Sequence, residues 1–223
     1  GNGVNVILFT GGASKWHNSF VSSSTNQIYK VEKNANAAKF IKNASLSGTY
    51  PLVAEGKCYN VSYKTGKASA FTGIYSGKYY VDSAVKKSEK AFYLISGNYV
   101  YKIAANGNAA KYIKDASKTG SYKLKIDSLL YSVEYSTAKY KLFTGIYKDQ
   151  YYKSGVFGSG WYTSSGTKFY FKDGNAYTGW HKISGKYYYF LTAAEGSLKK
   201  GALCVNRIVG NYYVDNGGVR VTD

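Results

Sequence analysis

Apolar and polar positions alternate with a period of two in several short runs of the chain. Residues 59–63 read Tyr-Asn-Val-Ser-Tyr, and residues 131–135 read Tyr-Ser-Val-Glu-Tyr. Successive side chains of a β-strand point to opposite faces, so this period predicts short strands with one buried face. The apolar run at residues 4–9 predicts a further strand.

Between residues 143 and 190 the pattern becomes a repeat of glycine, aromatic residue, polar gap and aromatic cluster. Its runs are FTGIYKDQYY, GWYTSSGTKFYF and TGWHKISGKYYYF. Asp173–Gly174 joins two aromatic runs and is typical of a two-residue hairpin turn, in which both residues need positive φ. Each unit of about twenty residues therefore predicts one β-hairpin. We expect an all-β fold: an elongated array of stacked β-hairpin repeats, that is, a β-hairpin solenoid.

From Asn26 onward the chain repeats itself at a fixed offset of 72 residues, without a gap. NANAAKFIKNAS at 34–45 recurs as NGNAAKYIKDAS at 106–117, and FTGIY at 71–75 recurs at 143–147. Repeats of this kind stack on their neighbours, because one unit alone cannot bury its apolar face.

These repeats divide the chain into four segments, with no linker richer than the turns themselves. Residues 1–25 are an N-terminal cap or the end of a preceding unit, 26–97 are a first long repeat, 98–154 are a truncated second one, and 155–223 hold short hairpin repeats. The run AAKYIKDA at 109–116 suits a short helix or a strand. We favour the strand, because a turn precedes the run and a glycine follows it closely.

Composition also indicates β structure with many turns. The 223 residues include 26 Tyr and 25 Gly, but 1 Pro and no Met. Tyr favours strands and Gly favours turns. Since Met is missing even at position 1, we expect a processed or excised piece of a longer protein. Cys58 and Cys204 lie far apart at apolar positions of the repeats, which predicts small buried hydrophobic residues rather than a disulfide.

The formal net charge of +18 points to anionic partners, and the lysines are scattered among the tyrosines. A field of this sign attracts polyanions, whether nucleic acid or anionic wall polymers such as teichoic acid or the acidic groups of peptidoglycan. Interleaved Tyr and Lys resemble a surface on which single-stranded nucleic acid stacks, but no known motif accompanies them, so we expect no nucleic-acid partner. No stretch reaches the about 18 apolar residues of a membrane span, and no signal peptide is evident.

The candidate catalytic and metal-binding groups stand alone in the sequence. His17 and His181 each follow a Trp, without a third ligand at metal-site spacing. Glu134 and Glu195 lack the second carboxylate that a glycosidase needs, and no GxSxG motif occurs. We therefore expect no enzyme activity, no cofactor and no metal site, with any catalytic domain lying outside this segment.

The short units carry a recognisable motif. TGW at 178–180 precedes GKYYYF at 185–190, and GW at 160–161 precedes KFYF at 168–171. Degenerate copies lie at 72–81, 144–152 and 201–214. The segment 155–223 thus resembles the cell-wall-binding repeats of Gram-positive surface proteins, which include choline-binding modules and the glucan-binding repeats of glucansucrases and clostridial toxins. The resemblance implies a secreted, cell-wall-associated module that binds cell-wall polymer (teichoic acid or peptidoglycan) or glucan.

In choline-binding relatives, three aromatic rings from two successive hairpins form a cage for a quaternary ammonium by cation–π attraction. Carried over by position, the resemblance implies two ligand-binding sets. One set is Trp161, Phe169 and Tyr189, and the other is Trp180, Tyr187 and Tyr213. Phe and Tyr stand at 169 and 187 where the family has Trp, which favours stacking on sugar rings over choline binding.

The alternative function is a structural or adhesive spacer, or a protein-docking repeat, of a larger surface protein. The 72-residue units favour it, because they depart furthest from the binding motif. Most single tyrosines would then serve packing, since burying one aromatic side chain contributes about 1.5–3 kcal/mol.

Overall fold

The structure is a computed structural model of the chain and describes residues 19–23, 25–32 and 36–221. Within these ranges every sheet is antiparallel and no helix occurs. The prediction of an all-β fold built from small hairpins is therefore confirmed. The strand expected at residues 4–9, and most of the cap expected at 1–25, lie outside the described residues.

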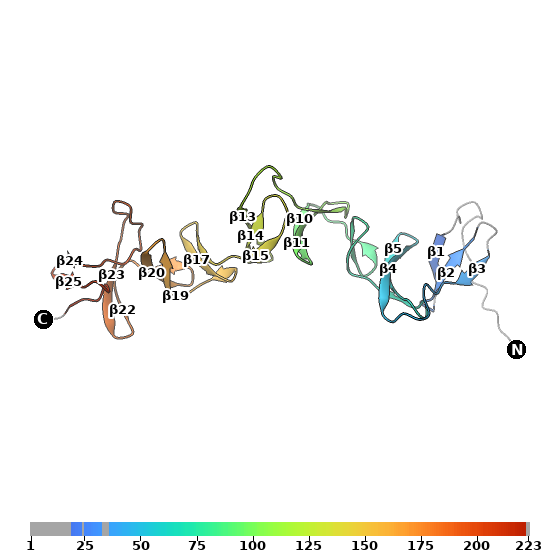
Figure 1. Cartoon of the computed structure of the whole chain (residues 1–223), viewed down its shortest axis with the longest axis horizontal. Coiled ribbons are helices and arrows are strands. Elements are labelled where there is room, and N and C mark those ends of the chain that lie inside the picture. The colour runs from blue at the N-terminus through green and yellow to red at the C-terminus, as the bar shows by residue number, and fades with distance from the viewer. Residues whose placement is uncertain (1–18, 24, 33–35, 222–223) are drawn as a thin grey trace. The chain divides into compact units, whose positions relative to one another are not determined.

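The chain forms two compact units, Gly1–Ile113 and Lys114–Asp223. In the described part of the first unit, strands that follow one another in sequence form the three-stranded sheets β1-β2-β3, β4-β5-β6, β7-β8-β9 and β10-β11-β12 (Figure 1). Their bounds are β1 Ser19–Ser22, β2 Ile28–Val31, β3 Ala37–Lys39, β4 Thr49–Ala54, β5 Lys57–Ser62, β6 Ala68–Ala70, β7 Gly73–Tyr75, β8 Lys78–Val81, β9 Ala84–Val85, β10 Phe92–Ser96, β11 Tyr99–Ile103 and β12 Ala109–Lys111.

The second unit begins with the sheet β13-β14-β15. A larger sheet has the order β16-β17-β21-β20-β19, with β18 also paired to β17, and the hairpins β22-β23 and β24-β25 follow. The bounds are β13 Ser121–Ile126, β14 Leu129–Glu134, β15 Tyr140–Leu142, β16 Gly145–Tyr147, β17 Gln150–Lys153, β18 Val156–Phe157, β19 Gly160–Ser164, β20 Thr167–Lys172, β21 Asn175–Ala176, β22 Gly179–Ile183, β23 Lys186–Phe190, β24 Arg207–Val209 and β25 Tyr212–Val214.

The 72-residue sequence repeat is also a repeat of strands. β3 begins at Ala37 and β12 begins at Ala109, an offset of 72 residues, and the same offset relates each strand from β4 to β9 to its counterpart from β13 to β18. The ambiguous run 109–116 contributes only the short strand β12, and an irregular segment follows.

The hairpin turns are set by pairs of residues with positive φ. Asp173 (φ 49°) and Gly174 (φ 82°) join β20 to β21, as this pair predicts. The same conformation occurs at Lys148–Asp149 and at Asp127–Ser128, where neither residue is glycine. Because positive φ at both central residues matches the twist of the flanking strands, these turns fix the register of each hairpin.

Backbone hydrogen bonds join successive hairpins inside each unit. The amide N of Cys58 in β5 donates to the carbonyl O of Ser83, which ends the turn between β8 and β9, at 2.9 Å. In the second unit the amide N of Leu130 donates to Gly155 O, also at 2.9 Å. Neighbouring hairpins are therefore stacked by main-chain contacts as well as by side chains.

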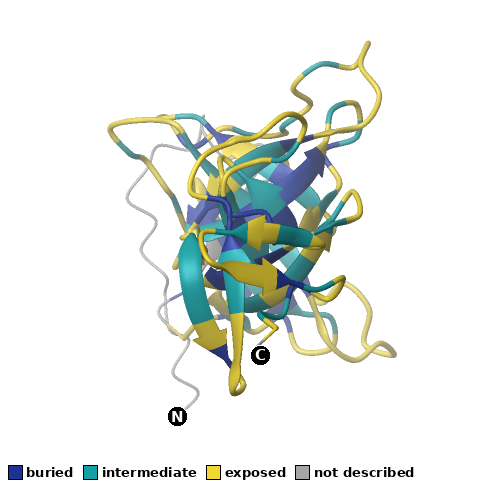
Figure 2. Ribbon diagram, turned by 90° about the vertical axis from the view of Figure 1, so that its left-hand side faces the viewer, coloured by how far each residue is buried: buried dark blue, intermediate teal, exposed yellow. Residues whose placement is uncertain are grey.

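The hydrophobic cores are small and lie between hairpins. Ile28, Tyr50 and Val61 are at the centre of one core in the first unit. In the second unit Phe169 and Phe171 belong to a core that also contains Tyr151, Leu191, Ala202, Cys204 and Val214. Figure 2 shows that most turns are exposed, whereas buried positions lie mainly on strands.

Both cysteines are free and buried. Cys58 and Cys204 are 0% and 3% exposed, which confirms the prediction that they act as small buried hydrophobic residues. Burial raises the pKa of each thiol, because the charged thiolate is disfavoured away from water.

Candidate ligand-binding notches

The β19–β20 hairpin carries aromatic side chains on both of its faces. Trp161 pairs with Tyr170, and the adjacent pair is Tyr162 with Phe169. Directly opposed residues share a face, while the next pair along lies on the other face. Trp161 and Tyr170 therefore occupy one face, and Tyr162 and Phe169 occupy the other.

The first candidate site, which we name the Trp161 notch, consists of Trp161, Tyr170 and Tyr188. The centroid of the Trp161 ring lies 5.2 Å from that of Tyr170 and 5.0 Å from that of Tyr188, both edge to face. Tyr188 belongs to the next hairpin, β22–β23, so rings of two successive hairpins meet here. Trp161 remains 43% exposed and borders a pocket of about 300 Å³ together with Tyr188 and Lys168.

The second candidate site, the Trp180 notch, consists of Trp180, Tyr189, Tyr212 and Tyr187. The Trp180 centroid lies 5.2 Å from Tyr189 and 5.7 Å from Tyr212, which belongs to the last hairpin. Trp180 pairs with Tyr189, and Tyr187 lies two residues before Tyr189, so all three share one face of β22–β23. The guanidinium carbon of Arg220 lies 4.5 Å from the Tyr187 centroid and 4.4 Å from that of Tyr212.

The first predicted set, Trp161 with Phe169 and Tyr189, is not brought together. Phe169 is 5% exposed in a core on the opposite face of its hairpin, and Tyr189 packs against that core. Tyr170 and Tyr188, each one residue away in sequence, are the rings that contact Trp161. The three predicted rings do not meet, because a one-residue step along a strand changes the face on which a side chain lies.

The second predicted set is partly brought together. Trp180 and Tyr187 share a face, but Tyr213 pairs with Ile208 on the other face of the last hairpin, where it is 46% exposed. The ring that reaches Trp180 is that of Tyr212. Sequence reasoning also missed Arg220, which no repeat motif contains.

His181 packs against aromatic rings. Its ring stacks on Tyr177 with centroids 3.9 Å apart and planes 15° apart. Its Nε2 lies 3.1 Å from the carbonyl O of Thr178. In the described ranges no group of three or more His, Cys, Asp and Glu residues is placed to hold a metal ion, and His17 lies outside those ranges.

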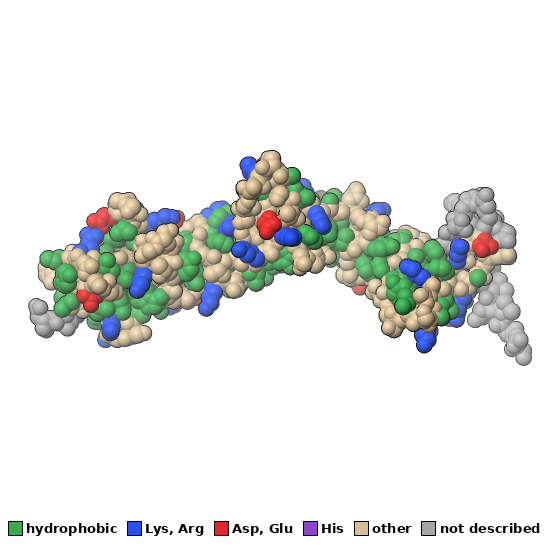
Figure 3. Space-filling view, viewed as in Figure 1, with side chains coloured by type: hydrophobic (Ala, Val, Ile, Leu, Met, Phe, Trp, Pro, Cys, Tyr) green, Lys and Arg blue, Asp and Glu red, His purple; other side chains and the backbone are tan. Residues whose placement is uncertain are grey.

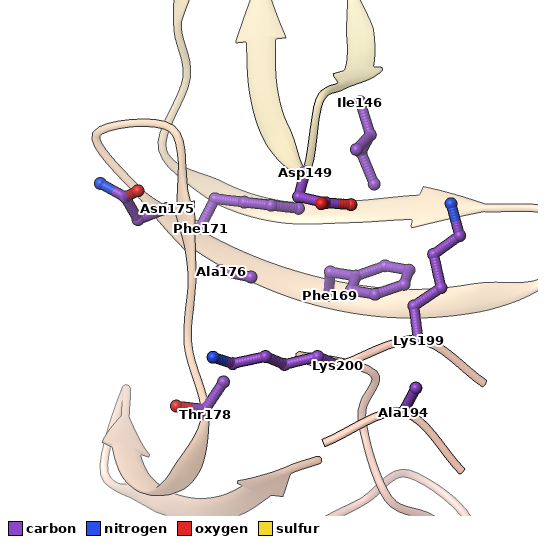
Figure 4. A pocket seen from close by; sticks show the side chains of 10 residues that line it. All are labelled: Ile146, Asp149, Phe169, Phe171, Asn175, Ala176, Thr178, Ala194, Lys199 and Lys200. Atoms are coloured by element: carbon purple, nitrogen blue, oxygen red, sulfur yellow. The ribbon is translucent and has the colours of Figure 1, made fainter. Parts of the chain in front are cut away.

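A third concave feature, which we name the lysine pocket, has a volume of about 500 Å³. Phe169 and Phe171 form its apolar wall, and Lys199 and Lys200 extend into it from the loop after β23 (Figure 4). Asp149 lies on the far side of the Phe169 ring from Lys200 in this view.

The long repeats contain their own cation–π contacts. In the first unit the Nζ of Lys42 lies 4.4 Å from the ring centroid of Tyr50 and 5.5 Å from that of Tyr63. In the second unit Lys114 lies 4.5 Å from Tyr122 and 5.7 Å from Tyr135. The lysine and both rings recur at the 72-residue offset, so we name this arrangement the lysine clip.

Positive charge is spread over both units and is little neutralised. The described residues contain the ion pairs Lys118–Asp115, at 3.4 Å, and Arg207–Glu195, at 2.8 Å. Hydrogen bonds from Arg207 lower the pKa of the Glu195 carboxyl. Figure 3 shows Lys and Arg side chains dispersed among apolar ones on the visible face.

Comparison with family models and with curated proteins finds no match. Solved structures do match. CbpJ of Streptococcus pneumoniae shares 23% identity over 87% of this chain and 62% of CbpJ, with a TM-score of 0.32. The chain is similar to choline-binding proteins. Choline binding protein F of the same organism, solved in the presence of a peptidoglycan analogue, shares 19% identity over 88% of this chain and 62% of its own, with a TM-score of 0.33.

The modular autolysin LytC of Streptococcus pneumoniae shares 16% identity, with 92% of this chain and 42% of LytC covered and a TM-score of 0.41. The chain thus spans less than two thirds of the length of CbpJ, choline binding protein F and LytC. No helix capable of crossing a membrane occurs in the described part of the chain.

Proposed function

We propose that this segment is a non-catalytic, cell-surface binding module. Its ligand is a bacterial cell-wall polymer or glycan, held at aromatic notches between successive hairpins and attracted by the positive charge of the chain. The whole protein is then secreted and associated with the wall, and any catalytic domain lies outside the segment.

The observation that carries this proposal is the exposed ring of Trp161. A tryptophan that served packing alone would gain free energy by burial, about 25 cal/mol for each Å² of apolar surface. Trp161 instead keeps 43% of its surface exposed, although Tyr170, Tyr188 and Phe190 lie within 6 Å of it. A supported and exposed indole beside a pocket is suited to a ligand that stacks.

The chemistry of the Trp161 notch suits two features of wall polymers. Electron-rich ring faces attract both the C–H faces of sugars and quaternary ammonium groups. Since 43% of the Trp161 surface is exposed, part of its ring remains accessible to a ligand. Lys168 lines the same pocket and adds attraction for anionic groups.

Retention on purified bacterial cell walls, prepared with and without teichoic acid, tests the proposal. We expect the wild-type chain to be retained and Trp161→Ala to lose affinity by about tenfold or more, as for a buried contact in a binding site. Ile208→Ala is the matched control, because Ile208 is an exposed apolar residue (71%) away from the notch. Circular dichroism verifies that both variants keep the fold. Failure of the wild-type chain to bind either wall preparation would contradict the proposal.

A structural or adhesive spacer is the second candidate function. The lysine clips favour it for the long repeats, because Lys42 and Lys114 already lie over the rings of Tyr50 and Tyr122. If the spacer function is correct, Trp161→Ala and Ile208→Ala behave alike, and neither changes the adhesion of the full chain.

A further inference from the structure

Arg220 occupies the Trp180 notch with the chain's own positive charge. Its guanidinium carbon lies 4.5 Å from the Tyr187 centroid and 4.4 Å from the Tyr212 centroid, so the group contacts the rings of two successive hairpins. Tyr187 and Tyr212 remain 38% and 46% exposed, so the site opens to solvent.

The backbone holds Arg220 at this place. Its amide N donates to the carbonyl O of Tyr187 at 2.8 Å, and Arg220 forms a bridge with Val214 of β25. The next residue, Val221, donates its amide to Tyr213 O at 2.9 Å. Main-chain bonds to both hairpins therefore fix the position from which the guanidinium reaches the rings.

No acceptor within the described residues neutralises this charge. The Nε of Arg220 is buried without a hydrogen-bond partner, and neither ion pair of the described residues includes Arg220. Lys182 adds a second positive charge, since its Nζ lies 5.4 Å from the same Tyr187 ring. Arg220 and Lys182 thus place two positive charges near one ring, an environment that an anion would stabilise.

A guanidinium on aromatic faces keeps its N–H donors in its own plane. Those donors match the two oxygens of a phosphate or carboxylate, which an ammonium group cannot match in the same way. Trp180 and Tyr189 supply an apolar surface beside the charges, where a sugar or polyol can lie.

We propose that the Trp180 notch is an oxyanion-binding site. It accepts a phosphodiester or carboxylate of an anionic wall polymer between Arg220 and Lys182, with the adjoining sugar or polyol against Trp180. This inference rests on the proposed function and makes it more specific. The proposal predicts that a quaternary ammonium binds poorly here, because Arg220 lies over the Tyr187 and Tyr212 rings and the positive charges of Arg220 and Lys182 would repel it.

The test uses the fluorescence of Trp180 in the full chain with Trp16→Phe and Trp161→Phe. The probes are poly(glycerol phosphate), a soluble peptidoglycan fragment with free carboxylates, and choline chloride. We expect at least one polyanion to titrate Trp180 and choline not to do so. Arg220→Gln should weaken polyanion binding by about tenfold or more. Arg220→Lys keeps the charge but loses the planar pair of N–H donors, so its affinity should lie between those of the parent chain and Arg220→Gln.

Titrations with poly(glycerol phosphate) and with the peptidoglycan fragment show whether the notch binds a phosphodiester or a carboxylate, and binding of either supports the inference. The inference is overturned if Arg220→Gln binds both polyanions as tightly as the parent chain, or if choline titrates Trp180 in the parent. Circular dichroism controls for folding of the variants. The soluble probes make this test independent of the wall-retention assay. If the chain is retained on walls through Trp161 but Arg220→Gln does not weaken polyanion binding, only the oxyanion-site inference fails and the proposed function stands.

Discussion

The Nζ of Lys114 lies 4.5 Å from the centroid of the Tyr122 ring. The equivalent pair one long repeat earlier, Lys42 and Tyr50, has a distance of 4.4 Å. The sequence runs 34–45 and 106–117, whose lysines form these contacts, match closely. The lysine clip is therefore a property of the repeat and not of one unit.

We expect Lys114→Ala to destabilise the second unit by about 0.5–1 kcal/mol, the value of an exposed cation–π contact. Urea unfolding followed by circular dichroism measures this change. Lys114→Arg keeps a cation over the ring and should retain most of the stability. Lys172→Ala removes an exposed lysine of β20 as the matched control, and an equal effect in both alanine variants would show that the clip contributes nothing.

The turn between β13 and β14 offers a stabilising substitution. Asp127 and Ser128 have φ values of 47° and 71°, although neither is glycine. The equivalent turn of the first unit is Glu55–Gly56. Because a left-handed conformation costs a non-glycine residue about 1–2 kcal/mol, Ser128→Gly should stabilise the second unit by roughly 1 kcal/mol after the entropy of glycine is subtracted.

The reverse substitution in the first unit is the matched control. A Cβ at Gly56 meets no atom within 4 Å, so Gly56→Ser adds strain in φ without a steric clash. We expect a lower midpoint of urea unfolding for Gly56→Ser and a higher one for Ser128→Gly. A decrease for both would mean that side-chain contacts of Ser128 outweigh its backbone strain.

These turns show how far the sequence could predict the fold. Asp173–Gly174 was predictable, because glycine and aspartate tolerate positive φ. Lys148–Asp149, with φ values of 50° and 61°, adopts the same turn but carries no glycine signal. It could be located only through the 72-residue repeat, which aligns it with Ser76–Gly77.

The candidate sites were less predictable than the fold, for a physical reason. In the run KFYF at 168–171 and in the pair Tyr212–Tyr213, rings stand at successive positions, so the period of two does not reveal which ring faces the neighbouring hairpin. Arg220 reaches its notch through a bridge to Val214 that no local pattern encodes. Motifs therefore single out Trp161 and Trp180 as candidate site residues, but they do not show which rings pack beside each tryptophan.

Alkaline pH should destabilise the fold. Burial raises the pKa of the Cys58 and Cys204 thiols, and burial also raises the pKa of the Tyr151 hydroxyl. A group whose pKa is higher in the folded state contributes its full stability below its ordinary pKa, which is about 8.5 for Cys and about 10 for Tyr. The free energy of unfolding should therefore be constant near neutral pH and fall as the pH rises above about 8.5.

Thiol labelling tests the burial of the two cysteines. We expect Cys58 and Cys204 to react slowly with a thiol reagent in the folded chain and rapidly in denaturant, because the thiolate is both buried and disfavoured. Cys204→Ala and Cys58→Ala assign the two rates. Rapid labelling of either residue in the native chain at neutral pH would contradict the packing of its core.

Gly158 is required for space and not for a left-handed φ. A Cβ built on Gly158 would lie 2.5 Å from Cε1 and 2.6 Å from Cδ1 of Tyr151, a buried ring of the second unit's core. Because that ring packs against Tyr162 and Phe171, it cannot move without disturbing the core. We expect Gly158→Ala to destabilise the second unit by about 1–3 kcal/mol, the range for overpacking.

A double-mutant cycle separates this steric effect from other consequences of the substitution. Gly166→Ala is the comparison for φ, because Gly166 has φ +79° with no atom within 4 Å of a Cβ, and it should cost roughly 1 kcal/mol or less. Tyr151→Leu removes the clashing ring, so Gly158→Ala should cost much less in that background. If Gly158→Ala destabilises the Tyr151→Leu background as much as the wild-type chain, a clash with Tyr151 is not the cause of the destabilisation.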